Sequence, residues 1–430
     1  MLRILLVNPP VYDFAAYDFW LRPYGLLSVA GFLRGKVSFR LFDYMDRRSR
    51  FVGGTRALVS DAWGRGRFIE QRIEPPAVFS GIPRRFRRFG LPREVFRGFL
   101  AEVGPFDVVL VQTMMTYWYP ALREVIDDVR QLSGRARIVL GGNYATLCTE
   151  HAERLGADLV VKGTELGPLW ESLGLSPDPE QPGLWEAYDD LGVGVLKLTQ
   201  GCPFACTYCS VPLVYGRFEP RSIERSLAEL ELLVKRGAED VAFYDDALLF
   251  RAQEVLVPFL EEVLRRGIHV NFHSPNALNA RFVTAELAQL MVRAGFKTFY
   301  LGFECARRQV QEATGGKVYS EELAAAVRHL TDAGADRGLI TAYQILGHPD
   351  MSAEDVEASM QFVHGLGIRG MLADFSPIPG TPDGRRCEQW VDMDEPLTHN
   401  KTAFTIWRMG FEPANRLKDL QRRFNRDIGS

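Results

Sequence analysis

The sequence contains few cysteines and no long hydrophobic run. Only six of its 430 residues are cysteine, and three of these lie within residues 202–209. Because sparse, clustered cysteines do not suit a disulfide framework, we expect a reducing compartment, the cytoplasm. No apolar run reaches the roughly 20 residues that a spanning helix needs, so no membrane span is expected. The opening segment, MLRILLVNPP, is broken too early for a secretion signal and is typical of a strand.

The sequence also lacks a strong excess of charge of either sign. Its formal net charge is −3, with 24% charged and 47% hydrophobic residues, which is ordinary for a globular protein. This balance argues against a general attraction to nucleic acid or to a membrane surface.

One segment departs from this balance. Residues 47–97 carry 13 arginines, no lysine and four acidic residues, and residues 83–90 read PRRFRRFG. We interpret residues 47–100 as a solvated amphipathic insertion. The alternative is a lid or docking surface for an anionic group, because arginine binds carboxylate and phosphate through two parallel hydrogen bonds.

The first 170 residues alternate apolar runs with amphipathic segments. Helices are expected near residues 25–35 and 120–132, and strands at residues 4–7, 39–42, 107–113, 137–146 and 157–165. This alternation predicts a doubly wound, Rossmann-like parallel sheet over residues 1–170. Such sheets bind ligands at the carboxyl ends of their strands, where Thr113, Thr116, Gly141 and Gly142 fall. The proline-rich, acidic residues 171–192 are typical of a linker.

Residues 193–382 contain a second series, of six strand–helix units. A complete eight-unit barrel typically needs about 250 residues, so the series predicts a partial (β/α)6 barrel of the TIM type. A charged helical tail, residues 383–430, follows it. The polar ends of the strands are expected on one rim, and they comprise the cysteine segment, Asp245 with Asp246, Asn276, Glu304, and Gly347 with His348.

Cys202, Cys206 and Cys209 follow the first strand of this barrel, with the spacing C-x3-C-x2-C. Three thiolates in one loop suit a soft metal. Structural zinc sites use four ligands, usually from two paired C-x2-C knuckles, and no second knuckle exists here. A four-iron cluster held by three cysteines leaves one iron open for another ligand.

The segment CPFACTYC resembles the cluster-binding loop of the radical S-adenosylmethionine superfamily, in which the open iron is chelated by S-adenosylmethionine. Over residues 193–382 the resemblance extends to FYDDALL, LGFECA, ITAYQILGHPDMSAEDV and PIPGTP. It implies a [4Fe-4S] cluster on the three cysteines. It also implies an S-adenosylmethionine site formed by Tyr208, Asp245, Asn276, Glu304, Leu346 and Gly347. His348 departs from the pattern, since a small apolar residue is common there.

Residues 1–170 resemble the cobalamin-binding domains that precede many of these barrels, on NPP, RPYGLLSVAGFLRG, QTMMTYWYPA and GGNYATLCTEHAERLGADLVVKGTE. The resemblance implies a cobalamin site near Thr113, Thr116, Gly141 and Gly142. The loop after the first strand lacks the Asp-x-His-x-x-Gly motif, so no histidine from it would bind the cobalt.

Together the two resemblances imply a radical enzyme that methylates an unactivated carbon of a small-molecule or peptide substrate. The arginine-rich insertion suggests that this substrate is anionic. An electron donor such as flavodoxin or ferredoxin would be required. A cyclase or rearrangement enzyme of the same architecture is the first alternative, and a non-catalytic metal-binding scaffold is the second. A methylthiotransferase would carry a second three-cysteine cluster in its first domain, where this chain has only Cys148.

Overall fold

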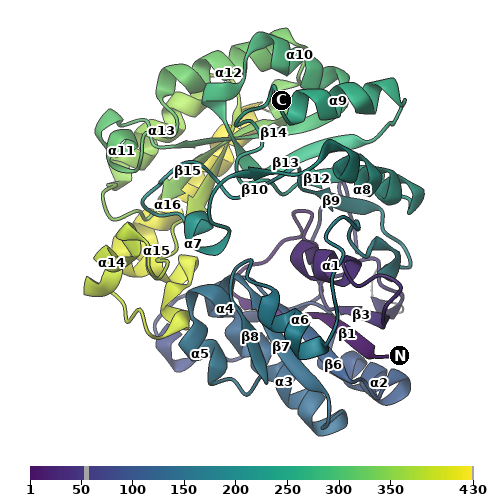
Figure 1. Cartoon of the computed structure of the whole chain (residues 1–430). Coiled ribbons are helices and arrows are strands. Elements are labelled where there is room, and N and C mark those ends of the chain that lie inside the picture. Colours follow the sequence, from purple (N-terminus) through teal and green to yellow (C-terminus); the bar gives the residue numbers. More distant parts are fainter. Residues whose placement is uncertain (53–57, 429–430) are drawn as a thin grey trace. The chain divides into compact units, whose positions relative to one another are not determined.

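The computed structural model describes residues 1–52 and 58–428, and these form two compact α/β units (Figure 1). Unit 1 comprises Met1–Gly194, Ala228–Ala238 and Asp394–Leu397. Unit 2 comprises Val195–Leu227, Glu239–Met393 and Thr398–Ser430. The prediction of two successive α/β folds is confirmed.

Unit 1 is built on a five-stranded parallel sheet in the order β3-β1-β6-β7-β8. Its strands are β1 (Arg3–Asn8), β3 (Ser38–Asp43), β6 (Val108–Thr113), β7 (Arg137–Gly142) and β8 (Leu159–Val161). Alternate residues point to opposite faces: Leu5 and Val7 pack in one core cluster and Ile4 and Leu6 in another. Because both faces are buried, the strands read as continuous apolar runs.

Helices cover both faces of this sheet. Residues of α2 (Arg93–Val103) and α3 (Tyr119–Leu132) pack with the Leu5 face, and residues of α1 (Tyr24–Gly31) and α6 (Gly167–Leu173) pack with the Ile4 face. The expected strand at residues 137–146 is shorter than predicted. It ends at Gly142, and the short helices α4 (Asn143–Leu147) and α5 (Thr149–Glu153) follow.

The arginine-rich insertion is amphipathic: Phe79 and Phe86 are buried, whereas Arg72, Arg84 and Arg85 are exposed. It contributes β4 (Glu70–Arg72) and β5 (Arg87–Phe89), which pair with β2 (Val11–Asp13) in an antiparallel sheet. The 3-10 turns η1 (Arg50–Val52) and η2 (Ala77–Phe79) also belong to it, and residues 53–57 lie outside the described ones. Arg88 is buried and its guanidinium lies 2.7 Å from the Glu124 carboxylate. Such pairing with acidic neighbours offsets part of the local charge.

The segment interpreted as a linker is also partly packed in unit 1. It contains η4 (Trp185–Ala187), and Trp185 is fully buried. The indole N–H of Trp185 donates to Glu229 at 2.9 Å, which satisfies the polar end of a buried ring.

Unit 2 contains a six-stranded sheet in the order β16-β15-β14-β13-β12-β9. The strands are β9 (Val193–Leu196), β12 (Asp240–Phe243), β13 (Asn271–Asn279), β14 (Phe296–Glu304), β15 (Ile340–Leu346) and β16 (Arg369–Asp374). From β12 to β16 every neighbouring pair is parallel. Consecutive strands joined by helices therefore place all their carboxyl ends on one rim, as the partial barrel predicts.

The connecting helices lie outside this sheet (Figure 1). They are α8 (Ile223–Lys235), α9 (Leu256–Arg265), α10 (Ala285–Arg293), α11 (Arg308–Ala313), α12 (Ser320–Asp332) and α13 (Ala353–Gly365), with η5 (Ala280–Phe282) and η6 (Arg337–Leu339) between them. The tail contains α14 (Pro382–Arg386), η7 (Cys387–Gln389), η8 (Pro396–His399), α15 (Lys401–Met409) and α16 (Phe411–Ile428). Helix α16 packs against β16 and α13, so it covers the last strand of the sheet.

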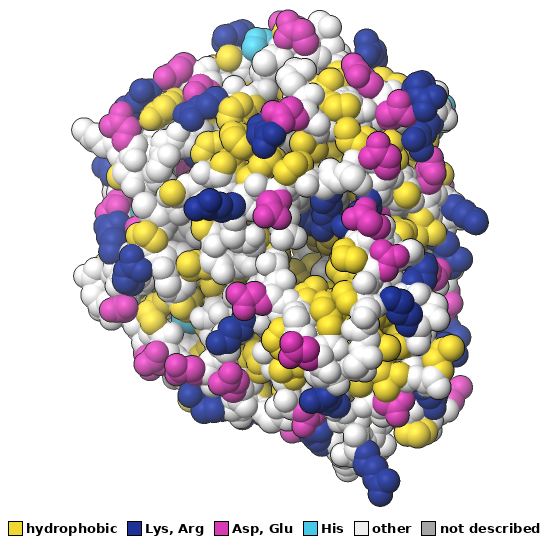
Figure 2. Space-filling model, viewed as in Figure 1, with side chains coloured by type: hydrophobic (Ala, Val, Ile, Leu, Met, Phe, Trp, Pro, Cys, Tyr) yellow, Lys and Arg dark blue, Asp and Glu magenta, His cyan; other side chains and the backbone are white. Residues whose placement is uncertain are grey.

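Charges of both signs are interspersed over the face shown in Figure 2, in keeping with the net charge of −3. Among the described residues, no helix combines the length and the apolar character that crossing a membrane requires.

Candidate functional site

The three clustered cysteines lie on a loop that is closed at its base by a short antiparallel pair. Strand β10 (Thr199–Gln200) pairs with β11 (Glu219–Pro220), and the short helix α7 (Val211–Val214) follows the last cysteine. Gly201 opens the loop with φ +72°, and a Cβ there would lie 2.3 Å from the Arg217 carbonyl oxygen. Only glycine fits this turn, so the start of the loop is fixed by the backbone.

Cys202, Cys206 and Cys209 are all free and half-buried. Burial raises the pKa of each thiol, that of Cys209 to about 11, whereas the nearby Lys317 ammonium lowers the pKa of all three. Backbone N–H groups donate to the sulfurs of Cys202 and Cys209, the latter from Val211 at 3.5 Å. These donors favour the thiolate forms that metal ligation requires.

The donor set, three free thiols in one loop, suits an iron–sulfur cluster. Among the described residues, no group of three or more His, Cys, Asp or Glu side chains is arranged to hold one metal ion. A zinc ion needs its ligands to converge within about 2.3 Å of one point. A four-iron cluster has no such need, because each thiolate binds a different iron. The charges of Cys206 and Cys202 each raise the pKa of Cys209, as expected for neighbouring thiols in one loop.

Lys317 is a residue of this site that the sequence reasoning missed. Its Nζ lies 3.9 Å from Glu304 Oε1. Burial lowers the pKa of Lys317, but the charges of Glu304 and the three cysteines raise it above its ordinary value overall. The sequence feature that could have indicated this residue is the glycine pair before it, Gly315-Gly316, which is typical of a tight turn. Gly315 has φ +109°, and a Cβ there would lie 3.3 Å from the Cys206 Cα, so the turn packs closely on the cysteine loop.

Glu304, the predicted contact at the end of β14, lies in this cluster of charges. It has φ +69°, one of three non-glycine residues with positive φ among those described. Backbone strain of this kind concentrates at functional sites, where the surrounding structure enforces it.

Asp245 and Asn276 hold neighbouring strand ends together. Asp245 is buried, and its Oδ1 accepts hydrogen bonds from the backbone N–H of Leu198, the backbone N–H of Thr199 and the Thr199 hydroxyl. Burial raises the pKa of Asp245 to about 6, although those bonds lower it. The Asn276 amide donates to the Tyr244 carbonyl at 2.9 Å. Both residues therefore have a structural role beside the predicted one.

Asp246 and Lys197 form a second charged pair on this rim. Their charged atoms lie 3.5 Å apart, and the Lys197 ammonium lies 4.5 Å from the centre of the Tyr215 ring. Burial raises the pKa of Asp246, and Lys197 and Lys317 lower it.

Leu346 and Gly347 end β15. The Leu346 carbonyl accepts from the Phe375 N–H at 2.8 Å and from the Thr405 hydroxyl at 3.4 Å. Gly347 has φ +89°, and a Cβ there would lie 2.8 Å from the Thr405 hydroxyl oxygen. Tyr208, between the cysteines, hydrogen-bonds Cys206 and meets the His348 ring edge-on at 6.4 Å.

In unit 1, the four residues predicted from the Rossmann-like pattern lie at the carboxyl edge of the sheet. The Thr113 hydroxyl accepts from the Ala145 N–H at 3.1 Å, and Thr116 is buried in η3 (Thr116–Trp118). Gly142 has φ +114°, and a Cβ there would collide with the Thr113 carbonyl oxygen. A Cβ on Gly141 would have only Val161 near it, at 3.9 Å.

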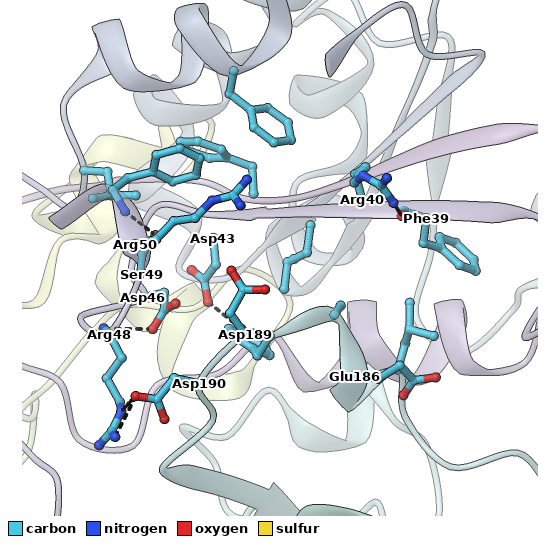
Figure 3. Close-up of a pocket in the computed structure, with 18 of the residues that line it drawn as sticks. Phe39, Arg40, Asp43, Asp46, Arg48, Ser49, Arg50, Glu186, Asp189 and Asp190 are labelled. Carbon is cyan, nitrogen blue, oxygen red and sulfur yellow. Dashed lines mark hydrogen bonds and ion pairs between the residues drawn. The ribbon is translucent and has the colours of Figure 1, made fainter. Parts of the chain in front are cut away.

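A separate cavity of about 600 Å³ lies beside the edge strand β3, and none of the predicted site residues lines it (Figure 3). Its charged lining is mixed. Arg48 pairs with Asp190 at 2.7 Å and Arg34 pairs with Glu186. The cavity therefore favours no ligand of one sign of charge.

Residues 196–363 match the family model of the radical SAM superfamily. A protein named as an uncharacterized methyltransferase of Pyrococcus horikoshii is 28% identical over 54% of this chain and 48% of its own length. The bacteriochlorophyllide d C-12(1)-methyltransferase of Chlorobaculum tepidum is 29% identical over 64% of this chain and 65% of its own. The ribosomal protein uS12 methylthiotransferase of Thermotoga maritima is 25% identical over 64% and 69%. The chain thus spans between about half and two thirds of the length of these relatives.

Two solved structures share the fold of nearly the whole chain. The radical S-adenosylmethionine methyltransferase TsrM from Kitasatospora setae, with tryptophan and a SAM analog bound, has a TM-score of 0.66 and 18% identity, and covers 90% of this chain and 76% of its own. The cobalamin-dependent S-adenosylmethionine radical enzyme OxsB has a TM-score of 0.59 and 13% identity, and covers 98% and 61%. Both likenesses span both units.

Proposed function

Because residues 196–363 match the radical SAM superfamily model, we propose that this chain cleaves S-adenosylmethionine reductively at a [4Fe-4S] cluster and uses the resulting radical to methylate an unactivated carbon. The observation that carries this proposal is the cysteine loop: three free, half-buried thiols at the carboxyl end of the first barrel strand, beside the cation of Lys317.

In this proposal the protein binds and shields the cluster, and the cluster supplies the electron-transfer chemistry. Cys202, Cys206 and Cys209 would hold the cluster through three of its irons, and the remaining iron would be available to S-adenosylmethionine. When bound, the cluster supplies the electron that breaks a carbon–sulfur bond of S-adenosylmethionine and so yields a 5′-deoxyadenosyl radical. Lys317 and Glu304 offer one charge of each sign beside the thiols, which suits an amino acid's carboxylate and ammonium groups.

Methyl transfer with cobalamin is supported by the comparisons and by unit 1. Two of the curated relatives are named as methyltransferases, and OxsB is named as cobalamin-dependent. The carboxyl edge of the unit 1 sheet, where Thr113, Gly141 and Gly142 lie, is where sheets of this kind bind their ligands. We assign Thr113, Thr116, Gly141 and Gly142 to this cofactor, and no cobalt-binding histidine to the loop after β1.

The principal alternative is a cyclase or rearrangement enzyme, which would use the same radical without a methyl donor. A methylthiotransferase is disfavoured, although one relative carries that name, because unit 1 has a single cysteine, Cys148. We further propose a cytoplasmic location, a flavodoxin- or ferredoxin-like reductant and an anionic small-molecule or peptide substrate. The free state of all six cysteines supports the location.

The reaction is tested anaerobically with S-adenosylmethionine that carries a deuterated methyl group and a small-molecule extract of the source cells. We expect a deuterated product that depends on cobalamin and on Cys206, accompanied by 5′-deoxyadenosine. Formation of 5′-deoxyadenosine without any deuterated product, with or without cobalamin, would favour the cyclase or rearrangement reading. Zinc in place of iron in anaerobically purified protein would favour a scaffold.

A further inference from the structure

The middle of the cysteine loop is bonded to a side chain 176 positions away. Thr207, which directly follows Cys206, donates its hydroxyl to Asp383 Oδ2 at 2.5 Å. In return, the Asp383 backbone N–H donates to the Thr207 carbonyl at 3.1 Å. This reciprocal pair ties the segment between Cys206 and Cys209 to the start of α14.

A buried histidine is the third member of this network. The Nδ1 atom of His348 accepts from the Asp350 backbone N–H at 3.1 Å, so the ring proton lies on Nε2. Nε2 donates to Asp383 Oδ2 at 3.1 Å. The ring is fully buried and meets Tyr208 and Phe375 edge-on. His348 therefore has a single orientation and a single donor, which is directed at the Asp383 carboxylate.

The elements that carry the pair are themselves fixed. His348 follows Gly347, whose positive φ and close approach to Thr405 allow no other residue. Asp383 lies in the first turn of α14, whose N-cap Thr381 accepts from the Gly384 N–H at 2.9 Å. Arg386 donates to the other carboxylate oxygen at 3.0 Å. Burial raises the pKa of Asp383, but the bonds from His348 and Thr207 lower it below its usual value overall.

We propose that His348 and Asp383 are positioning residues that hold the cysteine loop, through Thr207, in its cluster-binding conformation before the cluster is bound. The physical reason is that ordering a loop costs conformational entropy, which a preformed hydrogen-bonded contact removes from the binding step. This inference rests on the proposed function only in assigning the loop to a cluster.

The test compares H348F, which keeps an aromatic ring but loses the Nε2 donor, with H348Q, whose amide N–H can replace that donor. The matched control is H273F. His273 is also fully buried and bonds Asp240 and Thr298, each at 2.9 Å, at the amino ends of strands β12 to β14. Two readouts are used on the full-length chain. The first is the alkylation rate of each cysteine before iron is added, and the second is the rate of iron release to a chelator after anaerobic reconstitution.

In H348F we expect alkylation of Cys206 and Cys209 to rise about ten-fold and iron release to accelerate by a similar factor, with Cys148 unchanged. H348Q should restore both rates, and H273F should alter all cysteines alike or none. The inference is overturned if H348F raises the alkylation rates of Cys206 and Cys209 no more than H273F does. It is also overturned if H348Q has the same alkylation and iron-release rates as H348F. Wild-type protein that takes up no iron would contradict the proposed function instead, and the alkylation rates would still decide the positioning role.

Discussion

The ion pair between Lys317 and Glu304 gives the most quantitative prediction. At 3.9 Å two unit charges attract each other by about 4 kcal/mol at an effective dielectric constant of about 20. The two side chains keep 17% and 16% of their surface exposed, so screening should reduce the measurable coupling to about 2 kcal/mol. Replacing Lys317 with methionine keeps most of the length of the unbranched side chain and removes the charge.

The coupling is measured by a double-mutant cycle of K317M and E304Q. Because a chain with two units need not unfold in one step, the readout is native-state hydrogen exchange of the amides of residues 299–303 in β14. We expect each single variant to destabilise this strand and the double variant to recover about 2 kcal/mol. K317M should also slow alkylation of Cys206 near pH 8, since Lys317 lowers the pKa of that thiol.

K418M serves as the control, because Lys418 also forms an ion pair with a carboxylate of unit 2, Asp374, at 2.8 Å. It should leave the alkylation rates unchanged. A coupling below about 0.5 kcal/mol, or equal effects of K317M and K418M on Cys206, would refute the assignment of Lys317 to the cysteine site.

Three further predictions concern residues around the two sheets. The pKa of Asp245 in the folded state, about 6, exceeds the unfolded value of about 3.9, so the contribution of the Asp245 carboxyl to stability is lost as pH rises from about 4 to about 6. The wild type should therefore lose about 2–3 kcal/mol between pH 4 and pH 7 and D245N should not, measured by native-state hydrogen exchange of the amides of β12. G315A should destabilise the chain by about 2 kcal/mol and slow iron uptake, because its Cβ would press on the cysteine loop. The control G334A has a similar φ of +95° but open space around its Cβ, so it should cost only about 1 kcal/mol and leave iron uptake normal. R88M leaves Glu124 buried without its cation and should lower the stability of unit 1 by about 3–5 kcal/mol in calorimetry; a change under 1 kcal/mol would contradict this.

The two folds could be predicted from the sequence because their signals are local. Continuous apolar runs such as residues 4–7 mark strands buried on both faces, and the polar residues that follow each strand mark the rim. The cysteine spacing is local as well, so a candidate site could be proposed without a structure.

The remaining features could not be predicted, because they depend on pairings between distant segments. In the sequence, nothing distinguishes Lys317 from other lysines in turns between helices. Its place beside the cysteines follows from the packing of Gly315 against Cys206, which only the tertiary structure shows. His348 was expected on the rim as a departure from the family pattern, but its partner Asp383 is 35 positions away and was not predicted. The pairing of Arg88 with Glu124 and the burial of Trp185 likewise follow from tertiary packing, which composition does not encode.

The central claim is that three cysteines hold a cluster with one open iron, and one comparison tests it most directly. Wild-type protein, C206A and the control C148A are reconstituted anaerobically with iron and sulfide, reduced, and given S-adenosylmethionine. The account predicts about four irons per chain and 5′-deoxyadenosine from wild type and C148A, and loss of 5′-deoxyadenosine in C206A. Undiminished 5′-deoxyadenosine from C206A, or a wild-type protein that binds no iron, would contradict it.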